Sequence, residues 1–273
     1  MTRVASWFTK LFGTRLPLIG VVHLEPLPGS PAGRLSVRRI LERAQEDGRA
    51  YLRAGFNGLI LENFGDTPFL SGPAEPHTIA LLSRIGAALK DQAGDRPVGV
   101  NLLRNDGVGA LGAAIGAGLD FIRVNVLSGV FVTDQGLIEG RAAELLRYRK
   151  LLGSSVRVFA DHRVKHAAPL RREDVDVEVD ELVKRAHADA LLVTGSATGI
   201  PPTAESVAEV QRAAGAVPVL VASGTSLRNL ESLARHADGF IVGTSVKVSS
   251  RTGGRVDPAR ARALSGRLAR LRS

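Results

Sequence analysis

The chain has 273 residues, of which 44% are hydrophobic, 23% charged and 4% aromatic, which is the composition of an ordinary globular domain. The absence of cysteine excludes disulfides, thiolate metal sites and cysteine nucleophiles, and it fits a reducing, cytoplasmic location. A formal net charge of +9 favours acidic partners, with phosphorylated small molecules among them.

The first 15 residues predict a short helical extension. Trp7, Phe8, Leu11 and Phe12 recur at helical spacing, and we expect this helix to close the bottom of the fold. The alternative is that this helix makes a peripheral contact with a membrane or contacts a partner protein. No apolar stretch approaches the ~20 residues that a transmembrane helix needs.

Eight apolar runs that resemble strands follow the extension. Most are continuous Val/Ile/Leu runs, which are typical of parallel strands covered by helices. They occupy residues 17–24, 56–63, 97–103, 120–127, 156–162, 188–195, 218–224 and 238–244.

Helical patterns separate these runs. Ser36 and Thr203 are suitable N-caps, and Ser226 is expected to precede a helix directly, with Leu227 on its apolar face. Eight strand–helix units predict a single (β/α)8 TIM barrel over residues 1–273. A doubly wound sheet is the main competitor, but it usually has fewer strands and a single glycine-rich turn.

Three of the runs, within 190–199, 219–226 and 240–247, end in glycine and hydroxyl residues. Backbone N–H groups in such loops, together with Ser and Thr hydroxyls, suit an anion, and the loops after strands 7 and 8 are the usual phosphate site of a TIM barrel. The alternative is tight-turn glycines with N-cap hydroxyls. The candidate phosphate-binding residues are Gly195, Ser196, Ser223, Gly224, Thr225, Gly243, Thr244 and Ser245.

The segment 161–170 carries the densest group of reactive side chains. Strand geometry would place Asp161, Arg163 and Lys165 on one side, with His162 on the other. Lys165 suits a general acid, a Schiff-base nucleophile or a phosphate contact, and the adjacent His166 is a further candidate. The alternative is a salt bridge that ties Lys165 to Asp161.

Earlier strand ends supply further candidates. Glu62 suits the role of a general base. With Asp161 and His23 it could instead bind a divalent metal, although no HExxH-type spacing supports a metal site. A hydrogen-bonding role for Glu62 is the alternative. Asn101, Arg104 and Asn125 are expected to bind substrate, because Arg grips carboxylate or phosphate and Asn fixes hydroxyl groups.

The arginines between 251 and 272 lie on a segment of helical spacing and are expected to form its solvated face. Binding to nucleic acid is the less favoured alternative, because few aromatic residues are present to stack on bases.

These motifs together resemble the BtpA/SgcQ family over essentially the whole chain. The motifs are GVVHLEPLPGSP, ENFGDTPF, NLLRND, RVNV, TDQG, VKHAAPL, ADALLVTGSATG and VGTS with VDP. The resemblance implies a TIM barrel of the phosphate-binding kind. Its cyanobacterial members are extrinsic thylakoid proteins needed for photosystem I accumulation, whereas others sit among sugar-catabolism proteins. The motif positions are His23, Glu62, Asn63, Asp66, Asn101, Arg104, Asn105, Asn125, Asp134, Asp161, Lys165 and His166.

The chain departs from the expected family pattern at 162–163 and 247–254, and both changes are expected to make the mouth of the barrel more basic.

Two functions follow. The first is a lyase, isomerase or epimerase acting on a small phosphorylated metabolite such as a sugar phosphate, with Glu62, Asp161 and Lys165 as acid–base groups. The second is a non-catalytic assembly factor that uses its outer surface, including residues 7–12. A homo-oligomer is expected in either case.

Overall fold

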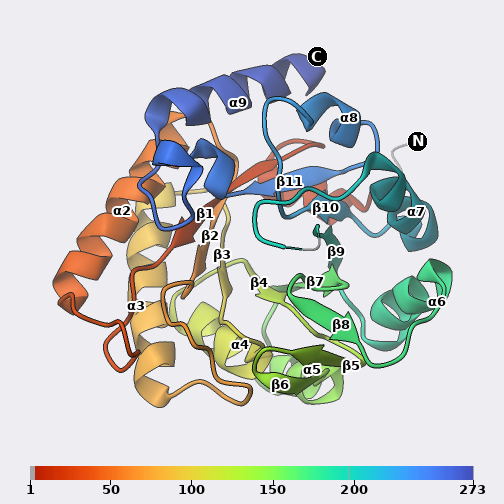
Figure 1. The fold of residues 1–273 in the computed structure, drawn as a ribbon, viewed down its shortest axis with the longest axis horizontal. Coiled ribbons are helices and arrows are strands. Elements are labelled where there is room, and N and C mark those ends of the chain that lie inside the picture. The colour runs from red at the N-terminus through yellow and green to blue at the C-terminus, as the bar shows by residue number, and fades with distance from the viewer. Residues whose placement is uncertain (1–3, 196, 273) are drawn as a thin grey trace.

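The computed structural model describes residues 4–195 and 197–272 and forms a closed barrel of eight parallel strands (Figure 1). Each strand falls within one of the predicted apolar runs, so the TIM-barrel prediction is confirmed. Around the barrel the strands are β1 (Leu18–His23), β2 (Gly58–Glu62), β3 (Val98–Asn101), β4 (Phe121–Val124), β7 (Arg157–His162), β9 (Ala190–Val193), β10 (Val219–Val221) and β11 (Gly239–Val242).

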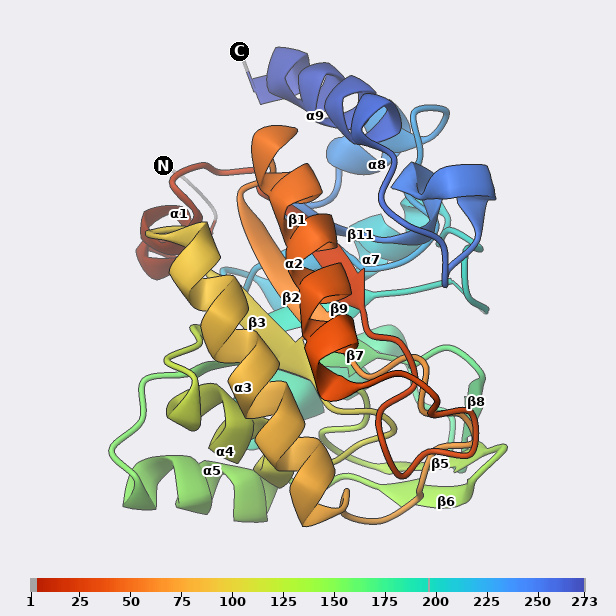
Figure 2. The same ribbon diagram turned by 90° about the vertical axis from the view of Figure 1, so that its left-hand side faces the viewer.

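The helices lie outside the barrel and cover the outer face of the strands (Figures 1 and 2). Ser36 and Thr203 cap two of them as predicted, because their hydroxyls accept the N–H groups of Arg39 and Ser206. The helices are α2 (Val37–Arg53), α3 (Pro76–Ala93), α4 (Gly107–Gly116), α5 (Ala142–Leu151), α6 (Val175–Asp180) with a π-helical turn (Glu181–Arg185), α7 (Ala204–Ala214), α8 (Leu230–Ala234) and α9 (Pro258–Arg272).

Helix α8 begins later than the sequence predicts. Asn229 Oδ1 accepts the Ser226 N–H at 2.8 Å, and Asn229 Nδ2 donates to the Gly224 carbonyl at 3.0 Å. These bonds close a turn ahead of the helix and leave Leu227 52% exposed. The hydroxyl-rich loop after β10 is therefore a turn in its own right, and the predicted helix N-terminus does not directly follow Ser226.

Helix α1 (Ser6–Phe12) closes the barrel at the end opposite the carboxyl ends of the strands (Figure 2). Phe8 and Phe12 are buried, and the Phe12 ring lies 6.1 Å from Phe121. The Arg157 guanidinium lies 4.6 Å from the centre of the Trp7 ring. The predicted closing helix is confirmed, and because the two buried rings pack against the barrel interior, they do not form an exposed membrane contact.

A small antiparallel sheet that the sequence did not predict lies at the carboxyl end of the barrel (Figure 2). It consists of β5 (Val130–Thr133), β6 (Gly136–Glu139) and β8 (Ala167–Pro169) in the order β6-β5-β8. Val132 pairs with Ala168, so the loop after β4 is joined to the loop after β7. This sheet forms one side of the mouth.

Helix α9 buries Ala261, Leu264 and Leu268. Several of the C-terminal arginines are paired within the protein, and they are not simply solvated. Arg272 donates to the Leu16 carbonyl at 2.6 Å, and Arg255 pairs with Glu46 at 2.7 Å. Among the described residues, no helix is both long enough and apolar enough to cross a membrane.

Candidate active site at the mouth of the barrel

Two cavities open side by side at the carboxyl ends of the strands. The rim cavity, of about 730 Å³, is lined by the loops after β10 and β11, at 223–226 and 243–245. The hairpin cavity, of about 560 Å³, is lined by the β5–β6 turn, at 134–135, and by the ends of β3 and β4. Both cavities share a wall made of Glu62, Arg123, Lys165 and Thr198.

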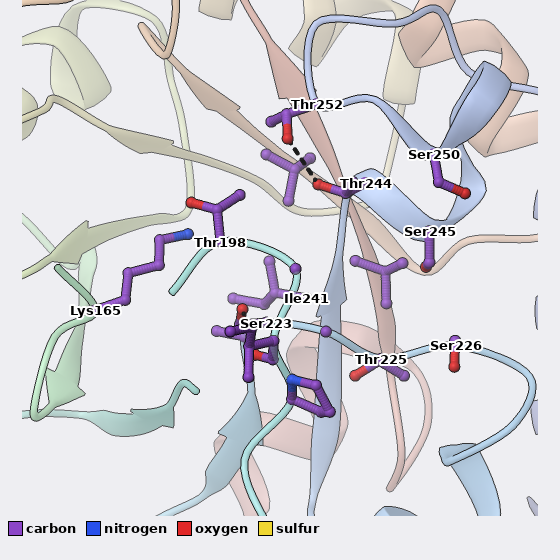
Figure 3. Close-up of a pocket in the computed structure, with 18 of the residues that line it drawn as sticks. Lys165, Thr198, Ser223, Thr225, Ser226, Ile241, Thr244, Ser245, Ser250 and Thr252 are labelled. Carbon is purple, nitrogen blue, oxygen red and sulfur yellow. Dashed lines mark hydrogen bonds between the residues drawn. The ribbon is translucent and has the colours of Figure 1, made fainter. Parts of the chain in front are cut away.

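The rim cavity carries the predicted hydroxyl groups (Figure 3). The hydroxyls of Thr225 and Ser245 are buried and have no hydrogen-bond partner within the described part of the chain. By contrast, Thr244 pairs with Thr252 at 3.1 Å, and the Ser223 hydroxyl donates to the Ile200 carbonyl at 3.1 Å. Two hydroxyls therefore lack the acceptor that a buried donor requires.

The predicted glycines allow close packing around this rim. Gly224 has a φ of 67°, and a side chain there would collide with the backbone of Ile200 and Pro201. Gly195 meets the same segment, and Gly243 lies against the His23 ring. Glycine is thus required at these positions so that the loops can approach one another. Ser196, the remaining candidate, lies outside the described residues.

Four polar side chains occupy one level of four neighbouring strands. The register pairs His23 of β1 with Glu62 of β2, then Glu62 with Asn101 of β3, and then Asn101 with Arg123 of β4. Each is the last or the next-to-last residue of its strand, so the mouth begins where the barrel core ends.

Arg123 is the centre of this polar layer. Its Nε and Nη2 donate to the two oxygens of Asp161 at 3.0 Å each, and its Nη1 donates to Glu62 Oε1 at 3.1 Å. Burial lowers the pKa of Arg123, but Asp161 and Glu62 outweigh burial and raise it. The guanidinium is therefore a permanent buried cation that fixes both carboxylates.

Asp161 does not fit the acid–base role predicted for it. Both of its oxygens accept bonds from Arg123, Asn125 Nδ2 donates to it at 2.7 Å, and it lines neither cavity. Its role is to position Arg123. The alternative of a divalent metal held by Glu62 and Asp161 is not favoured by this geometry, because the Arg123 guanidinium already donates to both carboxylates.

Glu62 keeps one oxygen available. Oε1 accepts from Arg123 and from Asn101 Nδ2, whereas Oε2 lies 3.9 Å from His23 Nε2 and accepts no hydrogen bond from the described residues. The pKa of His23 is held well below its usual value, first by burial and then by the nearby cations Lys247, Lys165 and Arg123. His23 is therefore neutral beside this free oxygen.

Lys165 has no side-chain partner among the described residues. Its backbone is held by Arg104, whose Nη2 donates to the Lys165 carbonyl at 2.7 Å. Burial, followed by repulsion from Arg123, lowers the pKa of Lys165. The alternative salt bridge to Asp161 does not form, because Arg123 already occupies that carboxylate.

His166 is exposed at the edge of the hairpin cavity. Its Nε2 lies 3.0 Å from the Thr198 hydroxyl and accepts the Thr198 N–H at 3.2 Å. Burial and then Lys165 lower the pKa of His166. His166 thus anchors the loop after β9, and it touches the site through Thr198.

The basic pair at 162–163 points away from the mouth. His162 and Arg163 both contact Glu178 of α6, at 2.9 and 2.7 Å. Strand β7 ends at His162, and Arg163 has a φ of 55°, so the alternation that predicted a shared side for Arg163 and Lys165 stops there. The prediction that this pair makes the mouth more basic is wrong, because Glu178 neutralises it.

The remaining motif residues divide between the cavity and its supporting loops. Asn101, Arg104, Asn125 and Asp134 line the hairpin cavity. Asn63 and Asp66 instead bond each other at 3.1 Å, and Asn105 bonds the Val126 backbone, so all three hold loops in place.

Two important side chains were not among the candidate site residues. One is Arg123. The other is Lys247, whose Nζ is buried and donates to the Thr252 carbonyl at 2.9 Å, which holds the loop at 248–254 beside the rim cavity. The available signal was a lysine two residues after Ser245, close to the glycine and hydroxyl residues that follow β11.

A closed parallel barrel with its polar side chains gathered at the carboxyl ends of the strands defines this chain as a TIM-barrel protein with a mouth site. The sequence matches the BtpA family over residues 14–270, and the chain belongs to that family.

Two relatives and one solved structure show the extent of the similarity. An uncharacterized protein of Thermococcus kodakarensis is 46% identical over 92% of this chain and 94% of its own. The photosystem I biogenesis protein BtpA of Synechocystis is 41% identical over 92% of this chain and 87% of its own. The phosphoribosyl anthranilate isomerase of Thermus thermophilus shares the fold, with a TM-score of 0.57 at 17% identity over 94% of this chain and 100% of its own.

Proposed function

We propose that this chain is an enzyme that binds a small phosphorylated metabolite, such as a sugar phosphate, and catalyses a lyase, isomerase or epimerase reaction. The observation that carries the proposal is the pair of buried hydroxyls of Thr225 and Ser245, in the loops after β10 and β11, which have no partner among the described residues. They line the same cavity as Lys165. A phosphate oxygen would supply the acceptors that both hydroxyls lack.

The two cavities would bind different parts of the ligand. The rim cavity would take the phosphate, and Arg228 and Arg251 in its lining add positive charge. The hairpin cavity would take the rest of the ligand, where Asn101 and Arg104 contribute polar contacts. The reacting atoms would then lie at the shared wall, where Glu62 Oε2 can move a proton and Lys165 can donate one.

Anion binding tests the first half of the proposal. We expect inorganic phosphate and sugar phosphates to raise the melting temperature of the wild type. Thr225→Val and Ser245→Ala should reduce that rise, because each removes one donor while nearly preserving the size of the side chain. Thr9→Val, in α1 at the closed end of the barrel, is the matched control and should respond like the wild type. A rise that is equal in all four proteins would refute the rim cavity as the phosphate site.

The Synechocystis relative favours an assembly factor as a second candidate. Residues 8 and 12 are buried under the barrel, so such a factor would use another surface. Complementation distinguishes the two functions. If Glu62→Gln and Lys165→Met restore a deletion strain as well as the wild type does, the enzyme proposal fails. The predicted homo-oligomer is tested by light scattering on the purified protein.

A further inference from the structure

Lys165 is the feature of the mouth that acid–base chemistry alone leaves unexplained. It is a largely buried lysine whose ammonium has no acceptor among the described residues, although two carboxylates lie in the same polar layer. Arg123 saturates Asp161 and takes one oxygen of Glu62. The site therefore prevents this lysine from forming a close ion pair with Asp161.

The position of Lys165 is also unlike that of a phosphate contact. The phosphate-type hydroxyls lie at the ends of β10 and β11, whereas Lys165 follows β7 and extends toward Thr198 from the facing wall (Figure 3). Lys165 lines both cavities. A ligand with its phosphate in the rim cavity and its other end in the hairpin cavity would pass its middle carbons across this side chain.

We infer that Lys165 is a covalent catalyst that forms an imine with the carbonyl carbon of a phosphorylated aldehyde or ketone. This inference rests on the proposed function, because the phosphate in the rim cavity places the carbonyl. The surroundings suit a nucleophilic amine: burial and the neighbouring Arg123 lower the pKa of the Lys165 ammonium, and Arg104 fixes the backbone that carries it.

The step balances without any further reactant. The Lys165 ammonium passes one proton to Glu62 Oε2 and attacks the carbonyl carbon through its free electron pair. The carbonyl oxygen takes up two protons, one from the lysine nitrogen and one returned by Glu62, and leaves as water. A C=N bond replaces the C=O bond, one hydrogen stays on the nitrogen, and no oxidation or reduction occurs. The resulting iminium withdraws electrons from the adjacent carbon, where Glu62 can then remove a proton.

Reductive trapping tests the inference. The protein is incubated with sodium cyanoborohydride and one of three probes, which are dihydroxyacetone phosphate, glyceraldehyde 3-phosphate and ribulose 5-phosphate. Peptide mass spectrometry should locate an adduct with the mass of the probe plus two hydrogens minus one water on Lys165. Glycerol 3-phosphate, which lacks a carbonyl, should give none.

Variants separate imine formation from charge. Lys165→Arg keeps a cation but cannot form the adduct, so we expect phosphate-dependent stabilisation to persist and trapping to be lost. Thr225→Val should weaken both the phosphate-dependent stabilisation and the trapping on Lys165. Lys184, which is exposed and paired with Asp180, and the buried Lys247 serve as internal controls and should stay unmodified.

The outcomes distinguish this inference from the proposed function. If phosphate stabilises the protein but no carbonyl probe is trapped on Lys165, the covalent role is overturned while the phosphorylated-ligand enzyme stands. An adduct spread over the exposed lysines also overturns it. If no phosphate compound binds, both the covalent role of Lys165 and the proposed function are refuted.

Discussion

The guanidinium of Arg123 donates to both carboxylate oxygens of Asp161, at 3.0 Å each, inside the barrel mouth. This bidentate pair joins β4 to β7, and the third donated bond reaches Glu62 on β2. The buried Arg123 cation therefore fixes the geometry of the polar layer. In that layer the second oxygen of Glu62, which Arg123 does not bind, faces His23.

Replacing Arg123 should destabilise the fold strongly. In Arg123→Met, two buried carboxylates lose their cation, and we expect a loss of ~3–5 kcal/mol in the free energy of unfolding. Urea denaturation measures it. Arg38→Met is the control, because its pair with Glu42 is exposed on α2, and it should leave stability close to that of the wild type. A loss equal to that of the control would contradict the central role of Arg123.

Acid should weaken the contact of α6 with the end of β7. Burial raises the pKa of Glu178, but hydrogen bonds from His162 and Arg163 outweigh burial and lower the pKa from its usual 4.5 to about 2. The pair therefore stabilises the fold above pH 4.5, and this contribution is lost as the pH falls toward 2.

The corresponding measurement compares unfolding of Glu178→Gln and the wild type across that range. The wild type should be more stable at neutral pH by ~1–3 kcal/mol, and the difference should shrink in acid. Glu209→Gln, on the exposed face of α7, should match the wild type at every pH. A constant difference between Glu178→Gln and the wild type would show that charge is not the cause.

Stability should also respond to alkaline pH through Lys247. Burial lowers the pKa of Lys247 from 10.5 to about 8, so between these values the unfolded chain binds more protons than the folded one. The wild type should therefore gain stability relative to Lys247→Met as the pH rises through this window, by at most ~1.4 kcal/mol per pH unit. Chemical denaturation at several pH values checks this. Parallel curves for the two proteins would argue against it, and Lys184→Met is the exposed control.

The closed end of the barrel should be important for stability and unimportant for ligand binding. Phe12→Ala removes a buried ring that packs 5.0 Å from Phe8, and we expect a cost of ~3–5 kcal/mol. Leu151→Ala, at a side chain 80% exposed, should cost less than ~0.5 kcal/mol. Phosphate stabilisation measured by thermal shift should be the same in both variants, because the rim cavity lies at the opposite end. A loss of that stabilisation in Phe12→Ala alone would show that the two ends are coupled.

The sequence predicted the barrel because its signals are local. Strands such as 188–195 are continuous apolar runs bounded by turn residues, and helices such as α2 begin at a capping serine. Each pattern reports the environment of a few neighbouring residues, so eight repeats were enough to indicate the architecture. The clustering of hydroxyls after β10 and β11 was visible for the same reason.

The pairing of side chains was decided by the tertiary structure. Arg123 lies 61 residues from Glu62 and 38 from Asp161, and only the register of β2, β4 and β7 makes them neighbours. The strand pattern placed Arg163 on the same side as Lys165, but the positive φ of Arg163 itself turns its side chain toward α6. The sequence by itself determined which residue types gather at the mouth of this barrel. Which carboxylate Arg123 occupies, and which lysine has no side-chain partner in the described part of the chain, depended on contacts between distant strands that no local pattern records.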